Sequence, residues 1–267
     1  MITRVAHKGK NELPVIGQVK CVQGKRVAHL TFLAPSDIQD SLELLSLLDG
    51  LIVQAGERGA YCVLAEVDEG DPIFESMRKV GFAVCGWQRI YKMPFKGRFD
   101  HAQDSLWEFA TPVVEAGIRL LYQSLVPPLM QAANPLPADR LFGLYHQQNG
   151  ETLAYVESIY GPEGIYLRPL IHPDLGNVPQ LLANLEEHLS PLLGRQVYLA
   201  VRSHQAWLEN ALGDADVLSS TRQALMVKHL ALTQRVTLTN PRRAMFEETG
   251  AEPTVSIIKN SSQESGL

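Results

Sequence analysis

The stretch that decides the fold is YLRPLIHPDLGNVPQLLANLEEHLSPLL, residues 166–193. It begins with apolar residues typical of a buried strand, passes through a short loop after Pro173, and ends in an amphipathic, leucine-rich helix. An earlier stretch, RVAHLTFLAPSDIQDSLELLSLLDGLIVQA, residues 26–55, follows the same order. After each stretch we expect a strand, a short helix and a last strand. The sequence therefore predicts an internal duplication of one α/β unit.

Length and charge limit the classes of function. A chain of 267 residues with 45% apolar residues is long enough for two compact cores. The net charge of -5 and the scattered Lys and Arg residues argue against nucleic acid and anionic membrane surfaces as partners. No apolar run approaches the ~20 residues that span a bilayer. We expect a protein with no nucleic-acid and no membrane partner.

Three cysteines, Cys21, Cys62 and Cys85, are odd in number and lack the spacing of metal ligands. Reduced thiols in a cytosolic protein are the simplest interpretation, and no metal site is expected. The first residues also lack the charged-then-apolar pattern of a secretory signal. The sequence therefore predicts a cytoplasmic location.

The predicted units have clear limits. The first unit, residues 1–95, has two hairpin strands, a long helix over 38–56, and a strand, short helix and strand up to residue 93. A linker rich in Gly, Pro and charge follows. The second unit, residues 106–235, begins with a helix after Thr111-Pro112, is irregular over 129–139, and has a hairpin at Asn149-Gly150. The polar residues 236–267 are expected to form a flexible tail.

This order of elements resembles the GNAT superfamily of acyl-CoA-dependent N-acetyltransferases. The strings that carry the resemblance are FESMRKVGF (74–82) and WQRIY (87–91) in the first unit, and LIHP (170–173) and RQALMVK (222–228) in the second. The resemblance implies two GNAT-like α/β units in tandem, with mixed, mostly antiparallel sheets and helices on both faces. The first unit is shortened, because it lacks the two helices that usually begin the family domain. Whether the units share one sheet or pack edge against edge stays open.

The resemblance also implies a co-substrate, acetyl-CoA or another acyl-CoA. In the family, a loop of the type Arg/Gln-x-x-Gly-x-Gly/Ala at the start of the long helix binds the pyrophosphate through backbone N–H groups. Counted from Pro173, the basic residue and the first glycine are replaced by Gly176 and Pro179. In the first unit, carboxylates such as Asp37 and Glu43 stand near the corresponding positions and would repel a pyrophosphate. The second unit is therefore the better candidate for an acyl-CoA site.

The resemblance assigns residues to that site. Those expected to bind the co-substrate are Leu170, Ile171, Gly176, Asn177, Val178 and Gln180. The usual general-acid tyrosine is replaced by Met77 in the first unit and by Glu209 in the second. Other groups must then serve catalysis.

We expect His172, Glu157 and Tyr160 to be the catalytic residues. His172 ends the central strand, where open α/β sheets bind ligands, and an imidazole there can deprotonate an amine. The alternative is that it caps the strand end. Further candidates with structural alternatives are Glu66 as a base, the hairpin residues Tyr145 and Tyr155 as cleft lining, and residues 202–205 as ligand contacts after a strand.

Two functions remain open at this point. One is an N-acyltransferase that moves an acyl group to a small-molecule amine, with its site in the second unit. The other is a non-catalytic module of the same fold that binds a small ligand or a protein partner, which the altered phosphate loops favour. The acceptor, the acyl group and the oligomeric state do not follow from the sequence.

Overall fold

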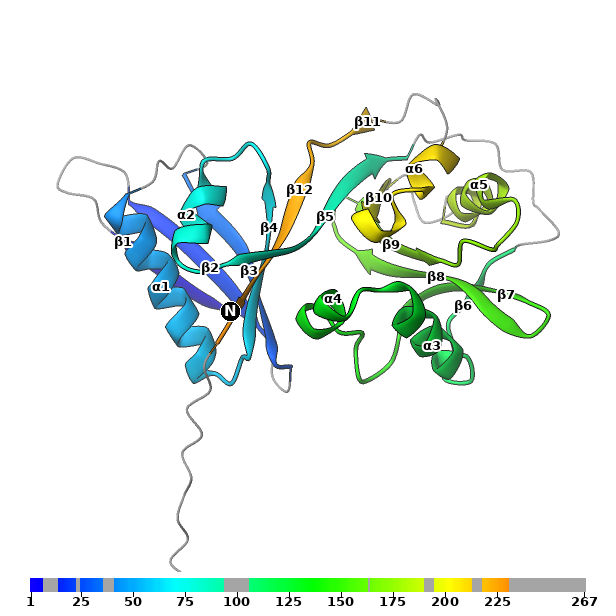
Figure 1. Cartoon of the computed structure of the whole chain (residues 1–267), viewed down its shortest axis with the longest axis horizontal. Coiled ribbons are helices and arrows are strands. Elements are labelled where there is room, and N and C mark those ends of the chain that lie inside the picture. The colour runs from blue at the N-terminus through cyan, green and yellow to red at the C-terminus, as the bar shows by residue number, and fades with distance from the viewer. Residues whose placement is uncertain are drawn as a thin grey trace, which may run out of the picture. The chain divides into compact units, whose positions relative to one another are not determined.

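The structure of the chain is a computed structural model that describes residues 1–6, 14–22, 25–35, 41–93, 106–162, 164–189, 195–212 and 218–230. These residues belong to one compact unit, residues 1–232 (Figure 1). The predicted linker between the two halves and the predicted tail lie outside the described residues. All bounds below refer to the described part of the chain.

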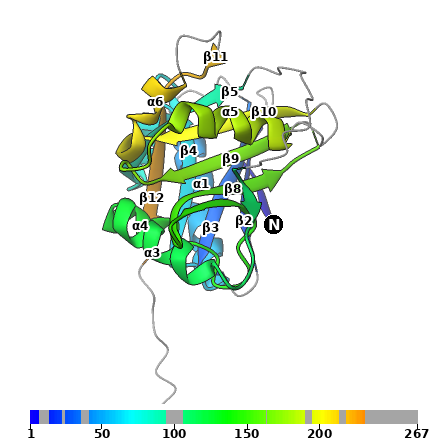
Figure 2. The ribbon, with the colours of Figure 1, turned by 90° about the vertical axis from the view of Figure 1, so that its right-hand side faces the viewer.

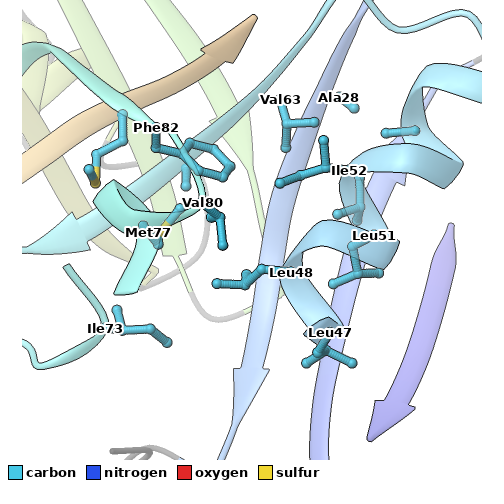
Figure 3. Packing of buried hydrophobic residues seen from close by; sticks show 14 of the residues in the cluster. Ala28, Leu47, Leu48, Leu51, Ile52, Val63, Ile73, Met77, Val80 and Phe82 are labelled. Carbon is cyan, nitrogen blue, oxygen red and sulfur yellow. The ribbon is translucent and has the colours of Figure 1, made fainter. Parts of the chain in front are cut away.

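The described residues of the first half form five strands and two helices in the predicted order. They are β1 (Ile2–Ala6), β2 (Val15–Cys21), β3 (Val27–Ala34), α1 (Leu42–Glu57), β4 (Cys62–Asp68), α2 (Ile73–Lys79) and β5 (Ala83–Lys92). No described helix precedes β2, as expected for a shortened unit. The N-cap of α1 is Ser41, whose hydroxyl accepts a hydrogen bond from the Leu44 N–H at 3.2 Å. The helix packs its leucines on the sheet and on α2, as Figure 3 shows for Leu48, Ile52 and Met77.

The second half repeats this order behind two additional helices. Its elements are β6 (Glu108–Phe109), α3 (Glu115–Leu125), α4 (Pro128–Ala133), β7 (Gly143–Gln148), β8 (Glu151–Tyr160), β9 (Gly164–Ile171), α5 (Val178–Leu189), β10 (Gln196–Arg202), η1 (Ser203–Gln205), α6 (Leu208–Ala211), β11 (Leu218–Ser219) and β12 (Gln223–His229). The hairpin predicted at Asn149-Gly150 joins β7 to β8, with φ of 54° and 82° at the two residues, as its tight turn requires. The segment predicted to be irregular, 129–139, is helical up to residue 133, because α4 begins at Pro128, a residue suited to the first turn of a helix.

All described strands form one sheet in the order β1-β2-β3-β4-β12-β5-β10-β9-β8-β7-β6, with β11 beside β5. Two pairs are parallel, β3 with β4 and β9 with β10, and each is connected through a long helix. All other pairs are antiparallel. Of the two arrangements left open by the sequence, one extended sheet is therefore the one observed.

The last strand of each half pairs with strands of the other half. β12 lies between β4 and β5, and β5 lies between β12 and β10. In the described chain, β5 pairs with no other strand of the first half. Neither half therefore completes its own sheet, and the two share a central pair of exchanged strands.

Helices cover both faces of the second half. α5 packs with one side of β8, β9 and β10, through residues such as Leu182, Leu167 and Val201. α3 packs on the opposite side, where Ile118 meets Tyr155 and Leu170. Figures 1 and 2 show α3 and α5 on the two sides of β8 and β9. The predicted fold class, a mixed α/β fold with mostly antiparallel strands and helices on both faces, is confirmed.

Candidate functional site

A row of polar side chains crosses the middle of the sheet. Gln88 on β5 stands directly opposite Gln223 on β12 and Arg202 on β10. Its Nε2 donates to Glu66 Oε2 at 3.1 Å and to Gln223 Oε1 at 3.2 Å, and it lies 3.4 Å from the Tyr166 hydroxyl. Directly opposed cross-strand neighbours share one face of a sheet. The exchanged strands β5 and β12 therefore supply the centre of a polar cluster that neither half forms alone.

Arg168 on β9 is held by two carboxylates. Its Nη1 lies 3.3 Å from Glu157 Oε2 on β8, and its Nη2 lies 3.9 Å from Glu66 Oε1 on β4. Burial opposes the charge of this guanidinium, but Glu157 and Glu66 outweigh burial and raise the pKa of Arg168 above its ordinary value. Arg168 is a fixed cation that connects the two halves of the chain.

Arg202, the last residue of β10, has a different environment. Like Arg168 Nε, its Nε atom is buried and has no hydrogen-bond partner, but no described carboxylate forms an ion pair with Arg202 as Glu157 and Glu66 do with Arg168. Burial lowers the pKa of Arg202, and the nearby Arg168 lowers it further. His204 follows in η1, and its Nδ1 is also buried without a partner. Burial, with a smaller effect of Arg202, lowers the pKa of His204 to about 4, so the imidazole is neutral at pH 7.

These charged residues line a pocket with a volume of about 50 Å³. A water molecule needs ~10–15 Å³ of such space, so the pocket can hold several water-sized groups. Its walls come from α3, the segment after α4, β8, β9 and the end of β10. The lining residues are Tyr122, Val126, Asn134, Pro135, Leu136, Pro137, Tyr155, Glu157, Arg168, Pro169, Leu170, Arg202 and His204. The lining is therefore charged at Glu157, Arg168 and Arg202 and otherwise largely apolar.

The pocket lies where the parallel strands separate. β9 and β10 pair from Gly164 with Gln196 to Leu167 with Leu199, and the pairing ends there. Arg168 and Arg202 stand beyond the last paired residues. The end of a parallel pair is a common place for ligands in α/β sheets.

The predicted catalytic residues do not meet in this pocket. Glu157 lines it, paired with Arg168. His172 lies just beyond β9, where its Nδ1 accepts a hydrogen bond from the Asp174 N–H at 3.3 Å, so it caps the loop as the structural alternative states. Tyr160 is exposed and pairs with Ile165 at the other end of β9. Along the strand, this position is about 20 Å from His172.

Of the residues predicted to bind the co-substrate, only Leu170 lies in the lining of the pocket. Leu170 lines the pocket, whereas Ile171 points to the opposite face and packs in the core beneath α5. Gly176, Asn177, Val178 and Gln180 surround the start of α5. Asn177 has φ of 56° and its side chain contacts that of Gln180, while Val178 is buried.

The arrangement at the start of α5 does not fit the pyrophosphate of an acyl-CoA. Pro179 in the first turn has no N–H to donate. The carboxylate of Asp174, 87% exposed, lies in the preceding loop and repels anions.

Gln205 occupies the gap where β9 and β10 separate, in which the family resemblance places the pantetheine chain of an acyl-CoA. The His172 N–H donates to Leu153 O on β8, so the Ile171 carbonyl faces β10. Gln205 Nε2 donates to that carbonyl at 2.8 Å, and the side chain is buried between the separating strands. The position of the expected family acid, Glu209, is also engaged, since its Oε2 lies 3.5 Å from Arg89 Nη1.

Arg168 and Tyr122 were not predicted as site residues. The signal for Arg168 is a single charge in an otherwise apolar strand between Leu167 and Pro169. Tyr122 donates to Asn134 O at 2.8 Å and has no comparable sequence signal. Of the further candidates, Tyr155, Arg202 and His204 line the pocket, and Tyr145 instead donates to Glu108.

In the described ranges, no three His, Cys, Asp or Glu side chains are grouped so that they could hold a metal ion. None of the described helices is long and apolar enough to cross a membrane. The three cysteines are not bonded to one another; Cys62 is buried, and Cys21 and Cys85 are half-buried.

No protein-family profile matches the chain, and no curated protein matches it. Among solved structures, a functionally unknown conserved protein from Staphylococcus epidermidis is 11% identical, with 77% of this chain and 85% of that chain covered and a TM-score of 0.51. A GCN5-related N-acetyltransferase from Kribbella flavida is 10% identical, with 85% and 90% covered and a TM-score of 0.49. A tandem GNAT protein from the clavulanic acid biosynthesis pathway is 13% identical, with 85% and 83% covered and a TM-score of 0.47. The likeness to the staphylococcal protein shows a shared fold alone, and the two lower scores carry no argument about this chain.

Proposed function

We propose that the chain is a small-molecule-binding module whose ligand occupies the pocket between α3, β8, β9 and β10. The observation that carries this proposal is the built pocket at the end of a parallel strand pair, lined by Arg168, Arg202 and Glu157. Gln205, in the gap beside it, supports ligand binding without acyl-CoA. This is the non-catalytic function that the altered phosphate loops favour.

A thermal-shift screen of small acids, amines and neutral molecules tests this function. Leu136→Trp places a large side chain in the pocket, whereas Leu129→Trp changes an exposed α4 residue outside the pocket and serves as the matched control. Ligand at about 100 times its Kd stabilises the protein by about 2.7 kcal/mol. We expect hits that stabilise the wild type and Leu129→Trp but not Leu136→Trp. A screen without hits in any class, or hits that survive Leu136→Trp, would overturn the proposal.

The second candidate is an N-acyltransferase that uses acetyl-CoA or another acyl-CoA and a small-molecule amine. The observation in its favour is Glu157, a carboxylate at the end of the parallel pair, where a base for an amine would stand. A GNAT-like function of this kind requires Pro179 and Gln205 to make room for the co-substrate. Substitutions of Pro179 and Gln205 therefore test whether the site can admit the co-substrate.

Calorimetric titration with acetyl-CoA and with free CoA separates the two candidates. The variants are Pro179→Gly, which restores an N–H, and Gln205→Ala, which frees the Ile171 carbonyl. We expect no heat from the wild type at millimolar ligand. Micromolar binding by the wild type, about -8 kcal/mol, would replace the binding module by the acyltransferase. Binding gained only by the variants would mean that the fold is suited to acyl-CoA but the native site has lost it.

A further inference from the structure

Arg202 is a buried cation that makes no hydrogen bond and no ion pair in the described part of the chain. Glu157, which lines the pocket, and Glu66 both lie within 4.0 Å of Arg168, and Glu66 acts on Arg202 only electrostatically. Arg202 Nε is buried and makes no hydrogen bond, although the guanidinium lines the pocket. A buried charge without a partner is costly, and folded proteins normally compensate it. A group that enters the pocket is the available source of that compensation.

The charge of the lining fixes the charge of this group. Of the two cations in the lining, Arg168 is already paired with Glu157 and Glu66, so Arg202 is the cation left to pair with a ligand. His204 adds none at pH 7, because its pKa is lowered to about 4. One unpaired cation matches a monoanion, whereas a phosphate dianion would leave an excess negative charge next to Glu157.

The geometry of the groups favours a carboxylate among monoanions. A guanidinium presents parallel N–H donors that fit the two oxygens of a carboxylate. His204 also lines the pocket, and its Nδ1 is a second polar atom that is buried without a hydrogen-bond partner. The remaining walls, from Val126, Leu136 and Leu170, are apolar and suit a short hydrocarbon chain.

We propose that the pocket binds the carboxylate group of a small organic acid, with Arg202 as the anion-binding residue. The inference rests on the proposed binding function and names its ligand class. Arg168, fixed by Glu157 and Glu66, forms the wall of the pocket. The same pocket would hold the carboxylate of an amino acid if acyl-CoA binding were found.

The test uses propionate, butyrate and their amides, which differ in charge but hardly in shape, and inorganic phosphate as the competing anion. Dissociation constants are measured by NMR titration of the wild-type protein, Arg202→Gln and Arg89→Gln. Arg89 is the matched control, because it lies on β5 outside the pocket lining and pairs with Glu209. We expect the acids to bind at least tenfold more tightly than the amides, Arg202→Gln to weaken the acids at least tenfold, and Arg89→Gln to leave them unchanged.

The comparison of acid with amide uses only wild-type protein, so it decides the matter even if Arg202→Gln does not fold. Equal affinity for acid and amide, or full affinity in Arg202→Gln, would overturn the inference. Tighter binding of phosphate than of either acid would overturn the carboxylate assignment as well. If the thermal-shift screen with Leu136→Trp yields only amines or neutral molecules as pocket ligands, that result would support the binding function and reject this inference. No hits at all would reject both.

Discussion

Arg168 on β9 and Glu66 on β4 form an ion pair across the two halves of the chain, with 3.9 Å between Nη2 and Oε1. The two strands are not neighbours in the sheet, since β12, β5 and β10 lie between them. The same guanidinium also pairs with Glu157 at 3.3 Å. One arginine therefore joins the second half, the first half and the wall of the pocket.

Replacing this arginine should destabilise the protein. Arg168→Gln leaves the carboxylates of Glu157 and Glu66 without their cation, and we expect the free energy of unfolding to fall by about 2–3 kcal/mol. Arg78→Gln, which breaks the exposed pair with Glu75, should change it by less than about 0.5 kcal/mol. Urea denaturation at pH 7 measures both. Equal effects of the two substitutions would show that the Arg168 pairs are not structurally important.

A glycine next to Glu157 should also be irreplaceable. A Cβ atom on Gly143 would lie 2.1 Å from the backbone oxygen of Val156, and β8 cannot give way without moving the residue that follows, Glu157. We expect Gly143→Ala to cost more than about 2 kcal/mol and to weaken ligand binding. Gly176→Ala, with no atom within 4 Å of the new Cβ, should change stability by less than about 0.5 kcal/mol. Thermal unfolding of both variants checks this, and a stable Gly143→Ala would contradict it.

Because β5 and β12 pair with strands of the other half, we expect the two halves to fold only together. A chain divided between residues 99 and 100 should give two fragments that each lack the strand inserted from the other half. Because uncovered sheet edges and apolar faces aggregate, we expect neither fragment alone to unfold cooperatively. The mixed fragments should form a complex with one cooperative transition, observed by circular dichroism and size-exclusion chromatography. Cooperative unfolding of the residues 1–99 fragment by itself would show that the exchange is not needed for folding.

His204 should make stability depend on pH. Its pKa is about 4 in the folded protein and 6.5 for an ordinary histidine, so between these values the unfolded chain binds more protons. Stability should therefore be complete above pH 6.5 and should fall as the pH is lowered towards 4. The shift corresponds to at most about 3 kcal/mol, which solvent screening reduces to about 1–2 kcal/mol.

The variant His204→Gln should lose this part of the pH dependence. Urea denaturation of both proteins at pH 7.0, 5.5 and 4.5 gives the difference in slope, and NMR titration of the imidazole gives its pKa directly. A His204 imidazole that titrates near 6.5 would contradict the expected burial. Other groups titrate in both proteins, so only the difference between them is informative.

Local patterns determined most of the secondary structure. The apolar runs of β3, β4 and β9, the leucines of α1 and α5, and the turn at Asn149-Gly150 all depend on neighbours a few residues apart, so their positions could be predicted. The repeat of strand, helix and strand also follows from such patterns. The start of α1 at Leu42, after the predicted residue 38, and the helix α4 mark the limit of this reasoning, because caps and short helices depend on packing.

Only the tertiary structure decided the pairing of the exchanged strands and the composition of the pocket. The apolar pattern of β5 and β12 is compatible with pairing in either half. The sequence alone therefore does not determine that Gln88 and Gln223 meet. Arg168 and Glu66, which are 102 positions apart in the chain, become an ion pair only because the shared sheet brings them together. The sequence determined the elements and their repetition through local periodicity, and long-range strand pairing determined where the charges of the site lie.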